Sequence, residues 1–453
     1  MPNLPCFPSL SRWERIGLGA LLATVVAFSA LVLFRSTMLP RRMGDWNVFT
    51  RAAWAVRTGG DLYDVADENG FHYLYPPLFA ILLAPLADAP AGAARSWMLP
   101  YPATVAIWYA LNVAFAALAM HLLAGALEQT SLQADSQPQR DRRWWRLRIW
   151  PVLACLPAIG HTLMRGQVGL LLLLLLCGMI AALLRGRKWQ AGAWLAAAIC
   201  IKVIPAFLLI YPLWRRDKRC LAGCAAGLAL GLVIVPAVVR GPRQTWEDYR
   251  KWNQVMLLPA AGIGDDQSRA REVIDVTGTD SQSISAAIHN TLFLDRATRP
   301  RRSPDWIRYL AMSLVAMLTL ATLAASSGTR PGDGIATVLA AGGLILVMLA
   351  ASPVCHLHYF CLAAPLVMGL LASAWENAAA PDLPRRLAAL LAFNAFCMTI
   401  PHFPGMEVLR DMGVATYGSM ALWLAGCQGL ARRWPQRCAL PPLSRDCVSK
   451  RAA

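Results

Sequence analysis

The sequence predicts an all-α integral membrane protein that crosses the bilayer many times, and three observations support this class. Of the 453 residues, 57% are hydrophobic and only 15% are charged, a more apolar composition than soluble domains have. Uncharged runs long enough to cross a hydrocarbon core of about 30 Å recur from Ile16–Phe34 to Gly413–Leu430. Basic residues collect in the short segments between these runs. We therefore expect a multi-helix bundle of about 10–13 transmembrane helices.

The formal net charge of +17 is explained by membrane topology and anionic lipid headgroups rather than by nucleic acid. The twelve cysteines are scattered, mostly within apolar segments, and show neither a disulfide framework nor a zinc-binding spacing. The signatures of P-loop, Gly-x-Ser-x-Gly, dinucleotide-binding and His-Glu-x-x-His enzymes are absent from the sequence. This absence argues against a nucleotide-sugar domain of the Rossmann kind, and we assign no cofactor and no metal-ligating residue from the sequence.

The first apolar run follows Arg12 and Arg15 and has no clear small-residue cleavage site before Arg35. It predicts a retained first helix with its N-terminus in the cytoplasm. By alternation, the polar residues 35–72 then form a first outer loop.

The apolar stretch Tyr73–Ala87 opens with Tyr75-Pro-Pro, and two prolines disfavour a straight span, so we expect a short or re-entrant element there. After a span at Tyr101–Leu123, the basic and aromatic segment Arg140–Arg148 is typical of a cytoplasmic interface. The next two apolar elements are joined by Arg165-Gly-Gln167, which this topology places on the outer side.

A single span over Trp189–Trp214 would put two equally basic turns, Arg185–Lys188 and Arg215–Arg219, on opposite faces of the membrane. A broken hairpin centred on Lys202 and Pro205 removes this conflict. Irregular backbone at membrane depth requires protein or a wet cavity around it.

Residues 240–305 form the longest polar connection and are predicted to be a second outer loop. Together, residues 1–431 form one transmembrane domain, and residues 432–453 form a basic cytoplasmic tail. Further spans are predicted at Leu221–Val239, Ile307–Ala325, Ile335–Ala351, Tyr359–Ser373, Leu387–Ile400 and Gly413–Leu430.

This topology brings unusual polar residues to one face, which predicts a functional site there. Asp45 is a candidate general base, or else a solvated loop acid or helix cap. Lys202 lies in an apolar stretch and needs an anion such as a lipid phosphate, unless it snorkels to an interface. The polar residues are Asp45, Tyr75, Arg165, Gln167, Lys202, the Asp280–Asn290 stretch with Gln282, His356 and His358.

Arg165 and Gln167 are suited to holding phosphate or sugar hydroxyls, or they form a simple polar turn. His356 and His358 either both point towards the interior of the bundle or are ordinary interface histidines. Two histidines without a nearby carboxylate supply only part of the ligands that a metal site needs. Gln282 lies in a polar segment suited to sugar hydroxyls, which is also typical of an ordinary loop.

Eight short motifs follow one another along the chain: Gly44-Asp45, Gly60-Asp-Leu-Tyr63, Tyr73-Leu-Tyr-Pro-Pro-Leu-Phe79, Leu83-Ala-Pro-Leu86, Gly166-Gln167, Lys202-x-x-Pro205, Asp280-Ser-Gln-Ser283 and Ser352-Pro-x-x-His-x-His-Tyr359. This ordered set resembles glycosyltransferase family 87, formerly DUF2029, over most of the chain. One departure is that many relatives show Ser-Trp-x-His-His where this chain has Cys355-His-Leu-His-Tyr359.

The resemblance implies a GT-C-type bundle in the bacterial inner (plasma) membrane, with the active site on its outer side. It also implies transfer of a sugar, mannose being the family's expectation, from a polyprenyl-phosphate carrier to a lipid or glycan acceptor with inversion. Asp45 would be the base; Lys202, Arg165 and His358 would surround the phosphate; Tyr75, Gln167, Gln282 and His356 would contact substrate.

Two other functions remain open from the sequence. A lipid or sugar transporter would also use midplane charges, although the inverted repeats of many transporters are absent. A polymerase or ligase of surface polysaccharide is the second alternative, because residues 240–305 contain several arginines. The sequence does not specify the donor sugar, the acceptor, metal dependence or the oligomeric state.

Overall fold

The computed structural model describes residues 12–434, apart from 40–42, 96, 132–136, 264–265, 267, 274, 277–279, 331 and 377–382. The described part is helical and contains no β-strand, only an isolated bridge between Ala66 and His72. The predicted basic tail lies almost entirely outside the described residues, because these end at Trp434.

Six helical rods in the described part are long and apolar enough to cross a membrane, and a seventh is counted if α5 and α6, bent by 65°, form one span. The chain is therefore an all-α, multi-pass integral membrane protein. Two shorter apolar segments, Gly169–Leu184 and Ile204–Trp214, add to the bundle. The six rods are α1 (Arg12–Met38), α4 (Tyr101–Ser131), α10 to α11 (Lys218–Arg240), α16 (Asp305–Ser327), α17 (Gly334–Ala351) and η6 to α18 (Leu357–Glu376).

Burial distinguishes the centre of the bundle from its lipid-facing rim. In the most apolar window of α17, 89% of the residues are buried, whereas in α1 only 6% are. An apolar helix that protein does not cover is stable only in lipid, so α1 lies at the rim and α17 at the core.

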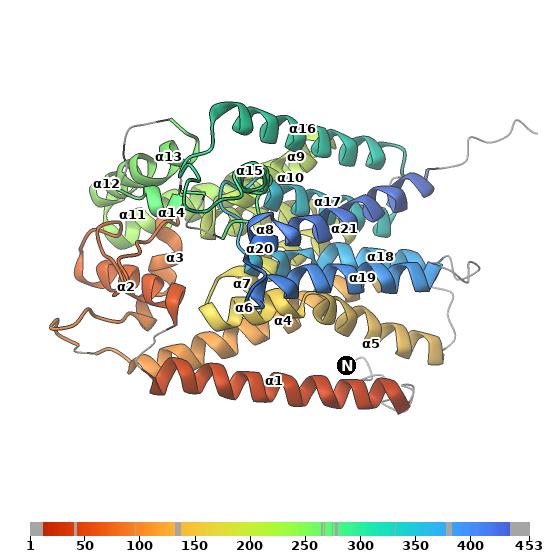
Figure 1. The fold of residues 1–453 in the computed structure, drawn as a ribbon, viewed down its shortest axis with the longest axis horizontal. Helices are drawn as coiled ribbons and strands as arrows, with labels where there is room; N and C mark the ends of the chain where they lie inside the picture. Colours follow the sequence, from red (N-terminus) through yellow and green to blue (C-terminus); the bar gives the residue numbers. More distant parts are fainter. Residues whose placement is uncertain are drawn as a thin grey trace, which may run out of the picture.

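The two predicted outer loops lie at the same end of the bundle, where Figure 1 shows the short helices α2 (Gly44–Thr58), α3 (Pro77–Leu82) and α12 (Pro242–Trp252) gathered together. Contacts between the loops agree with this arrangement. The His72 ring lies 3.0 Å from Glu272 Oε1, and Lys251 Nζ lies 2.8 Å from Asp61 Oδ2. The two loops therefore form one cap over the bundle.

The predicted broken hairpin is confirmed. Helix α8 (Lys188–Ile201) ends before Lys202, whose backbone is extended (φ −149°, ψ 131°), and the chain continues as η3 (Ile204–Leu209) and α9 (Ile210–Trp214). The Lys188 ammonium lies 3.2 Å from Asp217 Oδ2, so the two basic turns are neighbours at one end of the bundle.

The remaining helices complete the bundle and its cap. They are η2 (Ala84–Leu86), α5 (Gln137–Ala154), α6 (Leu156–Arg165), α7 (Gly169–Leu184), α10 (Lys218–Leu228), η4 (Ala229–Ile234), α11 (Val235–Arg240), η5 (Asn253–Leu257), α13 (Leu258–Ala260), α14 (Ala270–Val273), α15 (Ile284–Leu292), α19 (Leu383–Thr399), η7 (Ile400–His402), α20 (Glu407–Asp411) and α21 (Val414–Arg432).

Candidate active site

An acidic residue and a basic residue from distant parts of the chain meet beneath the cap. Asp45 lies in the first turn of α2, and Arg165 is the last residue of α6. The Arg165 guanidinium donates from Nε to Asp45 Oδ2 at 2.7 Å. Both side chains remain partly accessible, with exposed fractions of 41% for Arg165 and 23% for Asp45, so the pair borders open space.

The turn after α6 explains why these two helices approach each other so closely. Gly166 has a left-handed backbone (φ 71°), and a Cβ atom there would lie 2.6 Å from Met43 Sδ and 2.7 Å from Trp46 Cβ. The Trp108 indole stacks on Trp46 and donates to the Gly166 carbonyl oxygen at 2.8 Å. Only glycine fits here, and it fixes the start of α2 against the end of α6.

The charge state of Asp45 follows from this pairing. Burial favours the neutral acid, but the charge of Arg165 and its hydrogen bond outweigh this effect and hold the pKa of Asp45 below its usual value. Asp45 is therefore a carboxylate at neutral pH.

Lys202 occupies the break of the hairpin and enters the same region. Its ammonium donates to the hydroxyl oxygens of Tyr75, at 3.1 Å, and of Tyr359. It also lies 3.9 Å from the centroid of the Tyr359 ring. Within the described residues Lys202 has no acidic partner at ion-pair distance, so its positive charge is held only by neutral groups.

A cavity of about 710 Å³ connects these groups. Its walls are mostly apolar, and the side chains of Phe207, Met256 and Leu257 lie among them. Six of the eight residues that the sequence analysis assigned to a site line this cavity: Asp45, Tyr75, Arg165, Gln167, Lys202 and His356. The Tyr75 hydroxyl donates to Gln167 Oε1 at 3.3 Å, which ties two of them together.

The other two assigned residues are placed elsewhere. His358 is fully buried behind His356, with a ring-centroid separation of 5.3 Å, and neither of its ring nitrogens has a partner among the described residues. Gln282 is also fully buried: its amide donates to the Arg410 carbonyl oxygen at 2.7 Å and accepts from the Ala415 amide at 3.2 Å. Gln282 thus holds α20 and α21 in place.

Further polar residues line the cavity that the sequence analysis did not assign individually to the site. Tyr359 completes the His-Tyr motif, so the motif itself could have drawn attention to it. His72 and Glu272 come from the two outer loops, and only the pairing of those loops reveals them. Asp280 has a left-handed backbone (φ 47°) and lies 3.3 Å from Arg410, a strained arrangement of the kind found at functional sites.

Metal ligands are not grouped in the part of the chain that the structure covers. It contains no cluster of three or more His, Cys, Asp or Glu side chains arranged to hold a metal ion. Cations for an anionic ligand are instead available from Arg165 and Lys202.

The fold and the cavity define a multi-pass membrane protein with a charged cavity beneath the cap that the two loops form. Comparison with known proteins then specifies the family, because the sequence profile of glycosyltransferase family 87 matches residues 73–353. The chain belongs to this family and is a membrane glycosyltransferase, as its motifs had indicated.

Two bacterial relatives extend this similarity over most of the chain. A polyprenol-phosphate-mannose-dependent alpha-(1-2)-phosphatidylinositol mannoside mannosyltransferase of Mycobacterium tuberculosis is 25% identical over 391 residues, which cover 84% of this chain and 82% of the relative. The corresponding pentamannoside mannosyltransferase of Mycolicibacterium smegmatis is 25% identical over 376 residues, which cover 81% of this chain and 78% of the relative. No solved structure matches the chain.

Proposed function

We propose that this enzyme transfers mannose from polyprenyl-phosphate mannose to a hydroxyl group of a lipid or glycan acceptor, with inversion at the anomeric carbon. One observation carries the proposal: a carboxylate, a guanidinium and an ammonium that has no acidic partner among the described residues converge on one largely apolar cavity. The names of both relatives include this donor, which supports the choice of mannose and of its carrier.

The apolar walls suit the polyprenyl chain, and the cations suit its phosphate. Lys202 needs an anion, since neutral groups alone offset little of the cost of moving an ammonium ion out of water. In the proposed complex, Lys202 and Arg165 contact the phosphate oxygens. As the bond from C1 to the phosphate oxygen breaks, negative charge grows there, and these cations stabilise it.

Asp45 is the proposed general base. It removes the proton of the acceptor hydroxyl while that oxygen bonds to C1 and the polyprenyl phosphate leaves from the opposite face. The ion pair with Arg165 makes the resting carboxylate a weak base. When the donor binds, its phosphate is a second anion for Arg165, and the guanidinium moves away from Asp45 towards it. The Asp45 carboxylate then becomes a stronger base while the substrate is bound.

The remaining assigned residues receive supporting roles. Tyr75 and Gln167, which are hydrogen-bonded to each other, and His356 are placed to contact the sugar or the phosphate. His358 does not line the cavity, so we assign it a supporting role behind His356; contact with the phosphate would require its side chain to turn. Gln282 would support the site through the backbone of α20 and α21 rather than through the substrate.

We further propose a GT-C-type domain in the inner (plasma) membrane of a bacterium, with the cavity on the outer side. The basic turn at Lys188 lies one length of α8 away from Lys202, about 20 Å along the helix axis. This separation places positive charge at the end opposite the cavity, as expected when that end is cytoplasmic.

The test is a transfer assay with purified protein in nanodiscs, radiolabelled polyprenyl-phosphate mannose and a membrane lipid extract of the organism that encodes the chain. We expect a labelled product that appears with time and whose new linkage has the anomeric configuration opposite to that of the donor. Binding of the carrier without transfer to any acceptor would contradict the proposal and favour a transporter.

A further inference from the structure

A second cavity, of about 500 Å³, lies beside the first. Arg165 lines both cavities, so the Asp45–Arg165 pair stands at the wall between them. The described residues around the second cavity are Val32, Arg35, Ser36, Met43, Gly44, Asn47, Glu68, Asn69, Met164 and Arg165.

The first turns of α2 separate the two cavities. Gly44 and Asn47 line the second cavity, whereas Asp45, Val48 and Phe49 line the first. At 3.6 residues per turn, the mean directions of the two sets differ by about 120° around the axis of α2, so they lie on different faces of the helix. The candidate base is thus the immediate neighbour of a residue that borders the second cavity.

The two cavities differ in chemical character. Six of the ten described residues around the second cavity carry a polar or charged side chain, while apolar residues dominate the first. Both volumes fall within the range of small-molecule sites, about 300–1,000 Å³. A polar cavity of this size suits a sugar, whose hydroxyl groups need both donors and acceptors.

Asn47 gives specific evidence for a missing ligand. The residue is only 2% exposed, and its amide donates to Glu68 Oε2 at 2.9 Å, but its Oδ1 atom has no partner within the described part of the chain. Whichever way the amide is turned, one of its two polar atoms lacks a partner among the described residues. A buried amide atom of this kind needs a hydrogen bond from water or from a ligand.

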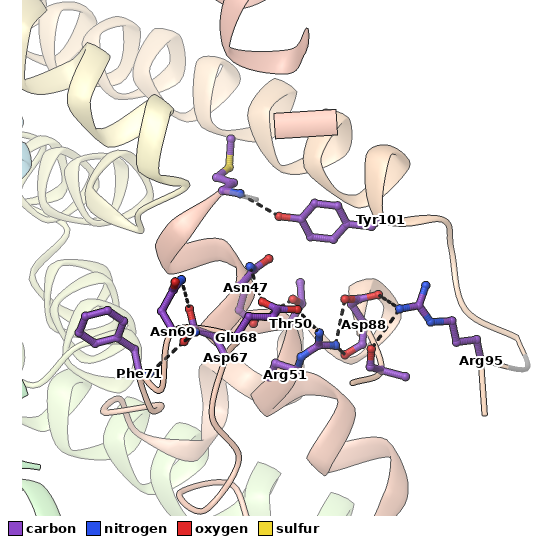
Figure 2. Close-up of polar contacts among 12 residues, drawn as sticks. Asn47, Thr50, Arg51, Asp67, Glu68, Asn69, Phe71, Asp88, Arg95 and Tyr101 are labelled. Atoms are coloured by element: carbon purple, nitrogen blue, oxygen red, sulfur yellow. Dashed lines mark hydrogen bonds and ion pairs between the residues drawn. The ribbon is translucent and has the colours of Figure 1, made fainter. Parts of the chain in front are cut away.

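The surrounding network holds these groups in position, as Figure 2 shows. Arg51 donates to Glu68 Oε1 at 2.6 Å and to Asp88 Oδ2 at 3.0 Å, which anchors the carboxylate beside Asn47. Asn69 is fixed in turn by Asp67, whose Oδ2 atom accepts from its amide at 3.2 Å. The polar wall is therefore arranged before any ligand binds.

We propose that the second cavity binds the sugar headgroup of the acceptor, with Asn47, Glu68 and Asn69 recognising its hydroxyl groups. The inference rests on the proposed function and adds the acceptor site to it. In this arrangement the donor occupies the apolar cavity and the acceptor the polar one, and the acceptor hydroxyl reaches Asp45 at the wall that the Asp45–Arg165 pair forms between them.

The test separates acceptor binding from donor binding by steady-state kinetics. The same transfer assay yields a KM for polyprenyl-phosphate mannose and an apparent KM for the lipid extract, expressed as mass concentration. Asn47→Leu and Asn69→Ala should each raise the acceptor KM about five- to tenfold, the effect of one or two lost hydrogen bonds, and change the donor KM less than about twofold. Phe207→Ala, in the apolar cavity, is the matched control and should raise only the donor KM.

Two results would overturn the assignment: an unchanged acceptor KM in both asparagine variants, or a rise in the donor KM instead. Because Asn47 is buried, Asn47→Leu must also retain the thermal unfolding temperature of the wild type. If it does not, the test rests on the acceptor KM of Asn69→Ala alone, because Asn69 is exposed. Failure of the wild-type protein to transfer mannose at all would contradict the proposed function itself, and this outcome is distinct from a loss confined to the variants.

Discussion

The Arg165 guanidinium lies 2.7 Å from the Asp45 carboxylate and joins α6 to α2 across 120 positions of sequence. This contact brings together the residue proposed as base and one of the two cations proposed to hold the phosphate. It also forms the wall between an apolar and a polar cavity.

The acid limb of the pH–rate profile should move when Arg165 is removed. Asp45 must be ionised to act as base, so activity is lost as the pH falls through its pKa. Arg165 lowers that pKa, and Arg165→Gln should therefore raise it and shift the acid limb of kcat/KM to higher pH. Arg165→Lys keeps the charge and should shift the limb less. An unchanged limb in Arg165→Gln would show that another group controls it.

Lys202→Met should separate function from stability. Loss of the cation is expected to lower kcat about 10²- to 10³-fold, since a preorganised charge on the leaving group is removed. The thermal unfolding temperature should stay constant or rise, because a charge without an acidic partner among the described residues is costly to bury. A large loss of stability would instead assign Lys202 a structural role.

Gly166→Ala should displace the Asp45 carboxylate without changing the residue itself. The added Cβ would collide with Met43 and Trp46 at the start of α2, so kcat should fall about 100-fold.

Gly186→Ala is the matched control: Gly186 also has a left-handed backbone (φ 69°), but nothing lies within 4 Å of the added atom. It should cost about 1–2 kcal/mol of stability and leave kcat intact. Equal activity losses in both variants would show that backbone strain alone is responsible.

The two histidines of the motif should differ in their effect on donor binding. His356 lines the cavity and His358 is buried behind it, so His356→Gln should raise the donor KM about tenfold. His358→Gln should change it less than about threefold and act mainly on thermal stability. The reverse order would mean that His358 turns into the cavity when the donor binds.

The sequence predicted the elements whose placement depends on the bilayer. The alternation of apolar runs and basic turns assigns each turn to one side, and this placed Asp45, Arg165 and Lys202 on one face before any contact was known. The hairpin at Lys202 was predicted for the same reason, and the contact between Lys188 and Asp217 confirms it.

What the sequence did not reveal depends on contacts between distant polar groups. The amide of Gln282 is occupied by backbone atoms more than 120 residues away, which no local pattern shows. The second cavity arises because the loop after α2 folds back, so that Glu68 meets Asn47 and Arg51, and because Arg51 also holds Asp88. Such pairings follow from the packing of the cap, where hydrophobic periodicity gives no guidance.

The most direct test of the proposed mechanism is the transfer rate of Asp45→Asn, measured together with its affinity for polyprenyl-phosphate mannose. The substitution keeps the size of the side chain and removes its ability to accept a proton. We predict a fall in kcat of about 10²- to 10⁴-fold with carrier binding retained. A variant that still transfers mannose at close to the wild-type rate would contradict the assignment of Asp45 as the base.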